Sequence, residues 1–333
     1  MQDLTEIVRS KFRELSVVIV GDLVADQFLH GTIARVSREA PVFILSHDTT
    51  DTHAGGAANA AVNVASLGGK PILVGVAGYD TNGDLLMRSL VDSSVDASCI
   101  VRDARVRTTA KVRVLAGQQY AARQQVIRID YENRTTLADD IREKLIESLT
   151  RSAADADAIV LSDYNYGVAD AAVFGAAKRL AEEHKIPLLV DSRFRLGDFP
   201  GATTATPNSD EVEQILGVGF TDQQCSKLRE KLGLDALLIT RGNKGMNLFE
   251  KDGLKAIKPV GSLEPVDVTG AGDTVIAVYA LGLASGLGYF EAANLANHAG
   301  GIVVMKKSTA SVTPAELIAS LETNAPLSEG SNA

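Results

Sequence analysis

Residues 158–191 read AIVLSDYNYGVADAAVFGAAKRLAEEHKIPLLVD, and this stretch decides the fold class. It begins with an apolar run that ends in Ser162-Asp163, continues with a helical pattern over 169–184, and closes with a second apolar run that ends in Asp191. Short apolar runs separated by one helical pattern are typical of buried parallel strands joined by a helix. The stretch therefore predicts a parallel α/β unit with polar side chains at the carboxyl ends of its strands.

The same alternation extends along the chain in both directions. Further strands are predicted at residues 16–20, 72–76 and 236–239, and further helices at 57–67, 137–151, 209–216, 221–232, 272–285 and 289–306. The predicted fold class is α/β, with a doubly wound, mostly parallel sheet flanked by helices. Ligands of such sheets bind beyond the carboxyl ends of the strands, so we expect the site there.

Two stretches break this alternation, because residues 27–53 and about 98–130 read as strands without helices between them. We expect them to pair into a small antiparallel sheet that forms a lid beside the main domain. Residues 1–325 are predicted to form one domain that carries this lid. Residues 326–333 are small and polar, which is typical of a disordered tail.

Composition and charge narrow the classes of function. The chain has 333 residues and a formal net charge of -9, which argues against a broad nucleic-acid-binding surface. Its two cysteines lie far apart in sequence and favour a reduced, cytoplasmic protein. The first residues contain no apolar signal core, and the longest apolar stretch, 274–288, is broken by glycines and too short to span a bilayer. We therefore expect no association with a membrane.

The segment with the clearest chemistry is DVTGAGDT, residues 267–274. Gly270-Ala271-Gly272 allows a tight turn and a close approach of the backbone to a ligand. The apolar helix predicted after it presents free N–H groups and a positive dipole end, which suit a transferring phosphoryl group. Asp273 in the first helical turn could take the proton of a hydroxyl beside this anion hole. Alone, such a segment is more often a helix cap than a site.

Five segments in order along residues 15–315 resemble the ribokinase family, the carbohydrate kinases of the phosphofructokinase-B type. They are Gly55-Gly56-Ala57-Ala58-Asn59 (the sugar-binding signature), residues 74–83 (the second glycine-rich strand end), residues 206–211 (the Asn-x-x-Glu segment), residues 240–245 (the nucleotide loop) and residues 267–273 (the C-terminal signature). Each has an ordinary structural explanation alone, and the ordered set favours the family.

The resemblance implies an enzyme, an ATP-dependent sugar kinase that uses Mg²⁺, and it implies a role for each matching residue. Asp273 is implied as the general base and Gly270, Ala271 and Gly272 as the anion hole; Asp26, Gly55, Gly56, Asn59 and Asp163 as sugar-binding; Thr240, Arg241, Gly242, Gly245 and Asn297 as nucleotide-binding; Asn208 and Glu211 as Mg²⁺-binding, through water; and Asp267 and Thr269 as ligands of a monovalent cation such as K⁺. Ser308 stands where relatives often have glycine, which bears on the cation site.

Three further stretches, residues 35–42, 110–114 and 125–130, resemble a subgroup that phosphorylates D-glycero-β-D-manno-heptose 7-phosphate for ADP-heptose and lipopolysaccharide synthesis. Lys111, Arg113 and Arg128 would then supply the positive charge that a sugar phosphate needs, unless they are solvated charges on strands. The chain departs from the subgroup where Tyr166 replaces a lysine and where Asp191-Ser192-Arg193 replaces Asp-Pro-Lys. A related sugar or sugar phosphate therefore stays an alternative substrate.

Two other classes of protein share features with this chain. A dinucleotide-dependent oxidoreductase would need Gly-x-Gly-x-x-Gly after the first strand, and Gly21-Asp22-Leu23-Val24 does not supply it. A non-catalytic sugar-binding regulator stays an alternative, although the intact Asp273 argues against it. A thin sheet leaves strand edges exposed and cannot bury both faces alone, so we expect a homodimer formed through the lid. The expected binding partner is a small-molecule sugar or sugar phosphate.

Overall fold

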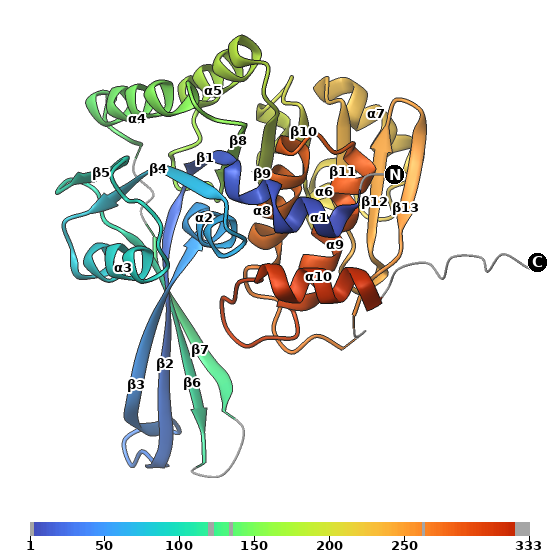
Figure 1. Ribbon diagram of the computed structural model, residues 1–333. Helices are drawn as coiled ribbons and strands as arrows, with labels where there is room; N and C mark the ends of the chain where they lie inside the picture. Colours follow the sequence, from blue (N-terminus) through green and yellow to red (C-terminus); the bar gives the residue numbers. More distant parts are fainter. Residues whose placement is uncertain (1–2, 119–122, 133–135, 262–263, 324–333) are drawn as a thin grey trace, which may run out of the picture.

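The computed structural model describes residues 3–118, 123–132, 136–261 and 264–323, which fold around two sheets (Figure 1). Within these residues the larger sheet has nine strands in the order β13-β12-β11-β10-β9-β8-β1-β4-β5. Their bounds are β1 (Ser16–Gly21), β4 (Lys70–Gly78), β5 (Ile100–Asp103), β8 (Ala158–Asp163), β9 (Leu188–Ser192), β10 (Thr204–Ala205), β11 (Ala236–Thr240), β12 (Met246–Glu250) and β13 (Gly253–Ile257). Neighbours from β5 to β11 pair in parallel, and β12 and β13 add antiparallel pairs at one edge. The predicted mostly parallel sheet is confirmed.

Helices pack on both faces of this sheet, so each buried strand serves two cores. Alternate residues of β1 divide between them, with Val17 and Ile19 in one core and Val18 and Val20 in the other. The helices of the first core are α1 (Leu4–Arg9), α2 (Ala57–Ser66), α3 (Thr81–Asp92), α8 (Ala271–Ala284), α9 (Tyr289–Val303) and α10 (Pro314–Thr323). Those of the second are α4 (Asp139–Ala153), α5 (Ala171–His184), α6 (Ser209–Leu216) and α7 (Asp222–Leu232).

The helix that follows the glycine segment, α8, is the most completely buried one. Every residue from Asp273 to Gly282 is buried, as expected for a helix that is apolar on all sides. The amino end of α8 points toward the carboxyl ends of the central strands, because Tyr164 after β8 contacts Asp273. Ligands of doubly wound sheets bind beyond the carboxyl ends of the strands, so the amino end of α8 lies where a ligand is expected.

The smaller sheet projects from one end of the main domain as the lid (Figure 1). Its strands are β2 (Leu23–Val36), β3 (Phe43–Gly56), β6 (Thr109–Gly117) and β7 (Gln124–Tyr131), in the order β3-β2-β6-β7. The outer pairs are antiparallel, and a parallel pairing of β2 with β6 joins them. Pairs such as Asp26 with Lys111 and Lys111 with Asp130 stand side by side, so these side chains share one face of the sheet.

Only part of the second predicted lid stretch, about 98–130, belongs to the lid. Residues 100–103 form β5, which pairs with β4 at the edge of the main sheet, and the lid begins again at Thr109. The predicted disordered tail, residues 326–333, lies outside the described residues. Among the residues that the structure describes, no helix is long and apolar enough to cross a membrane.

Candidate active site

Asp273 lies in the first turn of α8 and is only 2% exposed. Asn59 Nδ2 donates to its Oδ2 over 2.9 Å, and the Tyr164 hydroxyl donates to its Oδ1 over 2.8 Å. Burial raises the pKa of Asp273 to about 6, although both hydrogen bonds act in the opposite direction. A carboxylate with this pKa is mostly ionised at neutral pH and can accept a proton from a hydroxyl.

The glycines before Asp273 have different structural roles. Gly270 has a φ of 78°, and a Cβ there would lie 2.5 Å from Asn59 Nδ2, so a side chain is excluded. Gly272 faces open space, since a Cβ added there would meet no described atom within 4 Å. The N–H of Ala271 donates to Val268 O over 3.2 Å, whereas those of Gly272 and Asp273 have no backbone acceptor among the described residues. The open amides are thus those of Gly272 and Asp273.

The sugar-binding residues implied by the resemblance meet beside Asp273, with one exception. Asp26 lies opposite Gly55, where a Cβ would come within 2.5 Å of Asp26 Oδ2. Gly56, with a φ of 61°, is the N-cap residue of α2, and α2 carries Asn59 to Asp273. These residues, on β2, β3 and α2, therefore form one wall of a site at Asp273.

Asp163 is the exception, because its carboxylate is already occupied. It accepts hydrogen bonds from Arg195 Nη2 at 2.5 Å, from the Ser192 hydroxyl at 2.7 Å and from the Asn165 N–H at 3.0 Å. Its side chain is fully buried. Asp163 therefore holds the loop after β8, and its contact with sugar stays a prediction.

A cavity of about 710 Å³ opens next to Tyr164, between β6, β7 and the loops after β8 and β9. We call it the cationic cavity; the charged residues that line it are Lys111, Arg128, Asp130, Glu132, Asp170, Arg193 and Arg195. Of the cations, Arg128 is paired with Asp130 and Arg195 with Asp163. Lys111 and Arg193 form no ion pair within the described residues, so they are the cations available to an anion.

Lys111 is held in this cavity by aromatic rings. Its Nζ lies 5.2 Å from the centroid of the Tyr164 ring and 5.8 Å from that of Tyr166. Burial lowers the pKa of Lys111, and the nearby charge of Arg193 acts in the same direction. An anion in the cavity would relieve both effects.

Two of the three lid cations predicted to serve a sugar phosphate, Lys111 and Arg128, line the cationic cavity, but Arg113 does not. Arg113 Nη1 is 2.6 Å from Asp26 Oδ1, and its guanidinium lies over Phe28, 5.2 Å from the ring centroid. It lines a separate hollow of about 640 Å³, together with Phe28 and Asp267. Arg193, absent from the predicted site, stands in the cavity instead; its position after a strand that ends in Asp191-Ser192 was the signal that could have identified it.

The predicted nucleotide residues line another cavity, of about 450 Å³, which also reaches the anion hole. This nucleotide cavity is lined by Asn208, Thr240, Gly242, Gly245, Ala271, Gly272 and Asn297 together with apolar residues. Asn297 Nδ2 donates to Lys258 O over 2.8 Å. Arg241 lies instead in a neighbouring hollow of about 520 Å³, where it donates to Asn247 Oδ1. Its contact with nucleotide stays a prediction.

Asn208 and Glu211 cap α6 reciprocally. Glu211 N–H donates to Asn208 Oδ1 over 2.9 Å, and Asn208 N–H donates to Glu211 Oε2 over 2.8 Å. Burial raises the pKa of Glu211. Burial also raises the pKa of nearby Asp191 well above its ordinary value, and the negative charges of Glu211 and Asp273 act in the same direction. Asp191 is a residue of the site that sequence motifs did not assign. Burial and the neighbouring carboxylates oppose its ionisation, and a bound cation would relieve that effect.

The predicted monovalent-cation residues belong to two loops that are bound together. Asp267 accepts hydrogen bonds from the N–H of Thr269 at 2.9 Å and from that of Ser308 at 3.0 Å. Ser308 has a φ of 63°, which explains why glycine would suit this position. The Thr309 hydroxyl beside it is buried without a hydrogen-bond partner in the described part of the chain.

Comparison with known proteins agrees with this geometry. Residues 16–316 match the pfkB family carbohydrate kinase profile. The chain is 42% identical to the bifunctional protein HldE of Citrifermentans bemidjiense over 92% of its own length and 63% of the relative's, and 38% identical to that of Geobacter metallireducens over 93% and 63%. The chain thus spans less than two thirds of these relatives.

Solved structures share the fold at low sequence identity. Arabidopsis thaliana ribokinase complexed with ribose and ATP has a TM-score of 0.70 at 20% identity, over 92% of this chain and 98% of that one. Phosphofructokinase-2 from Escherichia coli in complex with potassium has a TM-score of 0.73 at 17% identity, over 92% and 99%. Because the family profile covers residues 16–316, the chain belongs to the pfkB family of carbohydrate kinases.

Proposed function

We propose that the chain phosphorylates a sugar that already carries a phosphate, namely D-glycero-β-D-manno-heptose 7-phosphate at its anomeric hydroxyl. The observation that carries this proposal is the pair of cations, Lys111 and Arg193, that have no carboxylate partner among the described residues and lie in the cavity beside Asp273. A sugar phosphate is nearly doubly negative, and charge-assisted contacts contribute about 1.5–3 kcal/mol each. The similarity of the chain to HldE proteins supports the same substrate.

The reaction follows from the arrangement of the two cavities. ATP would lie in the nucleotide cavity, with its γ-phosphate against the amides of Gly272 and Asp273. The distal phosphate of the sugar would lie against Lys111 and Arg193, which leaves the accepting hydroxyl at Asp273. Asp273 takes the proton as the hydroxyl oxygen bonds to the γ-phosphorus, the bond to the β-phosphate oxygen breaks, and ADP leaves. Asp273 then releases the proton to solvent.

The acidic residues near the phosphates fit a divalent cation. Asn208 and Glu211 would hold Mg²⁺ through water, and Asp191 adds negative charge beside them. Bound Mg²⁺ supplies positive charge against the ATP phosphates. Asp267 and Thr269 would lie beside a K⁺ ion, which is supported by the Thr309 hydroxyl that lacks a partner among the described residues.

The alternative substrate is another sugar phosphate, and one observation favours it. Tyr166 replaces the lysine of the heptose kinases, and its hydroxyl approaches Glu132 at 3.4 Å, so this part of the cavity is less cationic. A non-catalytic role is disfavoured because Asp273 and the open amides before it are intact.

A panel assay tests the proposal. Heptose 7-phosphate, free heptose, ribose, fructose and fructose phosphates are compared by ATP-dependent formation of ADP. We expect the highest kcat/KM with heptose 7-phosphate and a product phosphorylated at two positions, the 1,7-bisphosphate. A clearly higher kcat/KM with a neutral sugar would contradict the heptose phosphate assignment without contradicting the kinase assignment.

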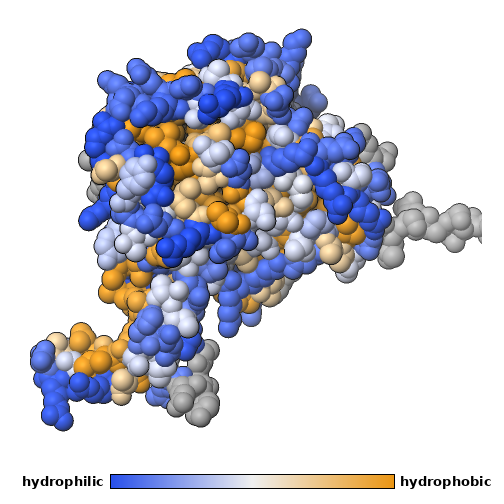
Figure 2. Space-filling view, turned by 60° about the vertical axis from the view of Figure 1, so that its left-hand side comes forward, coloured by the Kyte–Doolittle hydropathy of each residue, from blue (hydrophilic) through white to orange (hydrophobic). Residues whose placement is uncertain are grey.

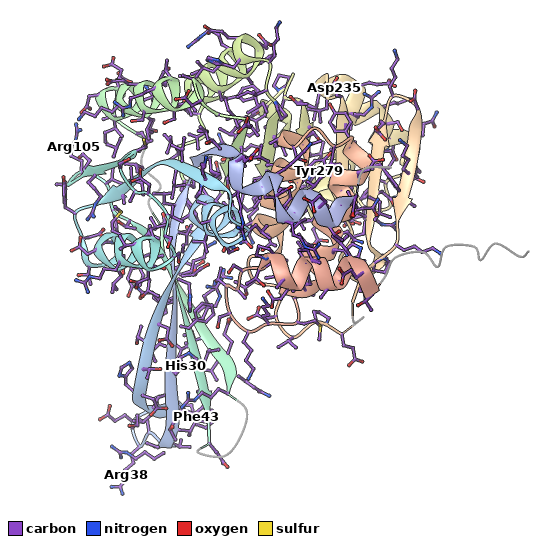
Figure 3. All side chains as sticks on the ribbon, in the orientation of Figure 1. His30, Arg38, Phe43, Arg105, Asp235 and Tyr279 are labelled. Atoms are coloured by element: carbon purple, nitrogen blue, oxygen red, sulfur yellow. The ribbon has the colours of Figure 1, made fainter. Side chains whose placement is uncertain are left out.

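We also propose that the chain is a cytoplasmic homodimer that serves lipopolysaccharide precursor synthesis. On β7, Arg128 and Asp130 face the cationic cavity, whereas the alternate residues Ile127, Ile129 and Tyr131 are 54%, 43% and 43% exposed. Apolar colour gathers along the lid in Figure 2, and Phe43 lies near its distal end, with Arg38 at the tip, in Figure 3. A second copy packed on this face would cover the exposed apolar side chains.

A further inference from the structure

Tyr164 lies between the catalytic base and the cationic cavity and contacts both. Its hydroxyl donates to Asp273 Oδ1 over 2.8 Å, and one ring face is 5.2 Å from Lys111 Nζ. The ring lies close to Gly56, since a Cβ built at that glycine would be in ordinary van der Waals contact, at 3.5 Å, with the Tyr164 ring carbon Cδ2. The ring is therefore restrained, and the hydroxyl points at the carboxylate in one direction.

The backbone that carries Tyr164 is fixed by the buried carboxylate of Asp22 at the end of β1. Asp22 accepts hydrogen bonds from three N–H groups of the loop after β8, those of Tyr164 at 2.9 Å, Tyr166 at 3.0 Å and Val168 at 3.0 Å. The carbonyl of Asp22 also accepts the N–H of Ala57, at the start of the helix that carries Asn59. One residue thus anchors both side chains that donate to Asp273.

We propose that Tyr164 is a positioning residue for the base, whose hydroxyl aims the Asp273 carboxylate and favours its ionised form, and that Asp22 holds Tyr164 and Asn59 in place together. This inference rests on the proposed role of Asp273 as general base. Together, Tyr164 and Asn59 hold each carboxylate oxygen by one donor, so the remaining lone pairs keep a defined direction toward the sugar.

The charged groups around Asp273 make these donors necessary. Asp26 from β2 and Asp191 from β9 oppose its ionisation, and Lys111 from β6 favours it. Burial opposes ionisation most strongly and raises the pKa to about 6. Losing a hydrogen bond that stabilises the charged form raises the pKa further, so the base would be protonated over more of the physiological range.

The test is Tyr164→Phe, which keeps the ring and its contact with Lys111 and removes only the hydroxyl. The pH dependence of kcat/KM is measured with the preferred sugar of the panel, together with the KM for ATP. We expect the acid limb of the pH profile to move up by about one pH unit in the variant. The loss of kcat/KM relative to wild type should then be roughly fivefold larger at pH 6 than at pH 8. The KM for ATP should be unchanged, because the hydroxyl does not reach the nucleotide cavity.

Tyr279→Phe is the matched control. Tyr279 is a fully buried tyrosine of α8 whose hydroxyl lies 3.4 Å from Thr204, inside the main domain (Figure 3). Its removal can cost stability but should leave the acid limb where it is in the wild type. A Tyr164→Phe enzyme with an unshifted acid limb overturns the inference, while an inactive Asp273→Asn enzyme would still support the proposed function. An active Asp273→Asn enzyme overturns the inference together with the role of Asp273 as general base, whereas the substrate panel tests the proposed function separately.

Asp22→Asn tests the anchor, because an amide nitrogen cannot accept the backbone N–H groups that one carboxylate oxygen now accepts. We expect its acid limb to move in the same direction as that of Tyr164→Phe. The double variant should lose less than the sum of the two single losses, since both act through one hydroxyl. Fully additive losses would show that Asp22 does not act through Tyr164. If the Asp22 variant does not fold, the result for Tyr164→Phe alone tests the inference.

Discussion

Arg113 and Asp26 form an ion pair across neighbouring lid strands, with Nη1 and Oδ1 2.6 Å apart and side chains only 12% and 8% exposed. The resemblance of residues 110–114 to the heptose kinase subgroup implied that Arg113 binds the phosphate of the substrate. The ion pair assigns it to Asp26, where it orients a carboxylate that can accept hydrogen bonds from sugar hydroxyls. Breaking such a buried pair leaves a charge without compensation, which is costly.

The first prediction distinguishes the role of Arg193 from that of Arg113. Arg193→Gln should lower kcat/KM for the sugar phosphate by about tenfold or more, the effect of one charge-assisted contact, and should barely change that for the free sugar. Arg113→Gln should lower both, because it leaves Asp26 unpaired beside the sugar. Kinetics of both variants with phosphorylated and free sugar test this. An Arg193 variant that keeps the full preference for the phosphorylated sugar would contradict the placement of the phosphate.

The second prediction concerns the base itself. Asp273→Asn should fold and bind ATP normally, yet lose on the order of 10²–10⁴-fold in turnover, as expected for a positioned general base. ATP binding is measured by calorimetry and turnover by formation of ADP. Near-normal turnover would refute the role of Asp273.

The third prediction uses the same variant to measure stability against pH. The pKa of Asp273 in the folded chain, about 6, lies above its ordinary value, so the protonated form is favoured on folding. The stabilisation is fully present below the unfolded pKa of about 4 and is lost as the pH rises through 6. Asp273→Asn removes the buried charge and should raise the free energy of unfolding at pH 8 by about 1–3 kcal/mol relative to wild type.

Denaturant unfolding of both proteins at pH 4, 6 and 8 measures this difference. The gain should be smallest at pH 4, where Asp273 is neutral in the wild type as well. An equal difference at all three pH values would show that the charge of Asp273 is not the cause.

The fourth prediction compares the two glycines before the base. Gly270→Ala should destabilise the fold by about 1–3 kcal/mol, because φ is 78° and the new Cβ would meet Asn59. Gly272→Ala faces open space and should keep or slightly raise stability, since alanine favours a helix. Its added methyl should instead weaken ATP turnover at the open amides. Thermal unfolding and kinetics of the pair give opposite patterns if the anion hole is assigned correctly.

The fifth prediction concerns the lid. Replacing Ile127 and Ile129 together by Asp should convert a dimer into a monomer, because buried charges oppose packing of the apolar face. Sedimentation at micromolar concentration measures the mass. Val218→Asp is the matched control, since Val218 is 91% exposed but lies in the loop between α6 and α7. A wild-type monomer under these conditions would contradict the proposed assembly.

Much of the fold could be predicted because its signals are local. The strands and helices from 158 to 191 and the buried helix after Gly270 appear as patterns within short windows, and the structure confirms them. Elements whose identity depends on a distant partner were missed, among them β5 and the hairpin of β12 and β13. α3 was missed as well, although Asp80 caps its first turn locally. Residues 100–103 form part of the main sheet because they pair with the edge strand β4. A local sequence pattern contains no information about this pairing.

The sequence by itself determined the local pattern of the candidate site. The glycine segment, Asp273 and the helix that follows are contiguous in the chain, so their spacing predicts a turn, free amides and a carboxylate together. Only the tertiary structure decided how the charged groups pair. Arg113 meets Asp26 across 87 positions and Tyr164 meets Asp273 across 109. A charged side chain takes whichever partner the fold brings within a few ångströms, because electrostatic pairing depends on distance in space.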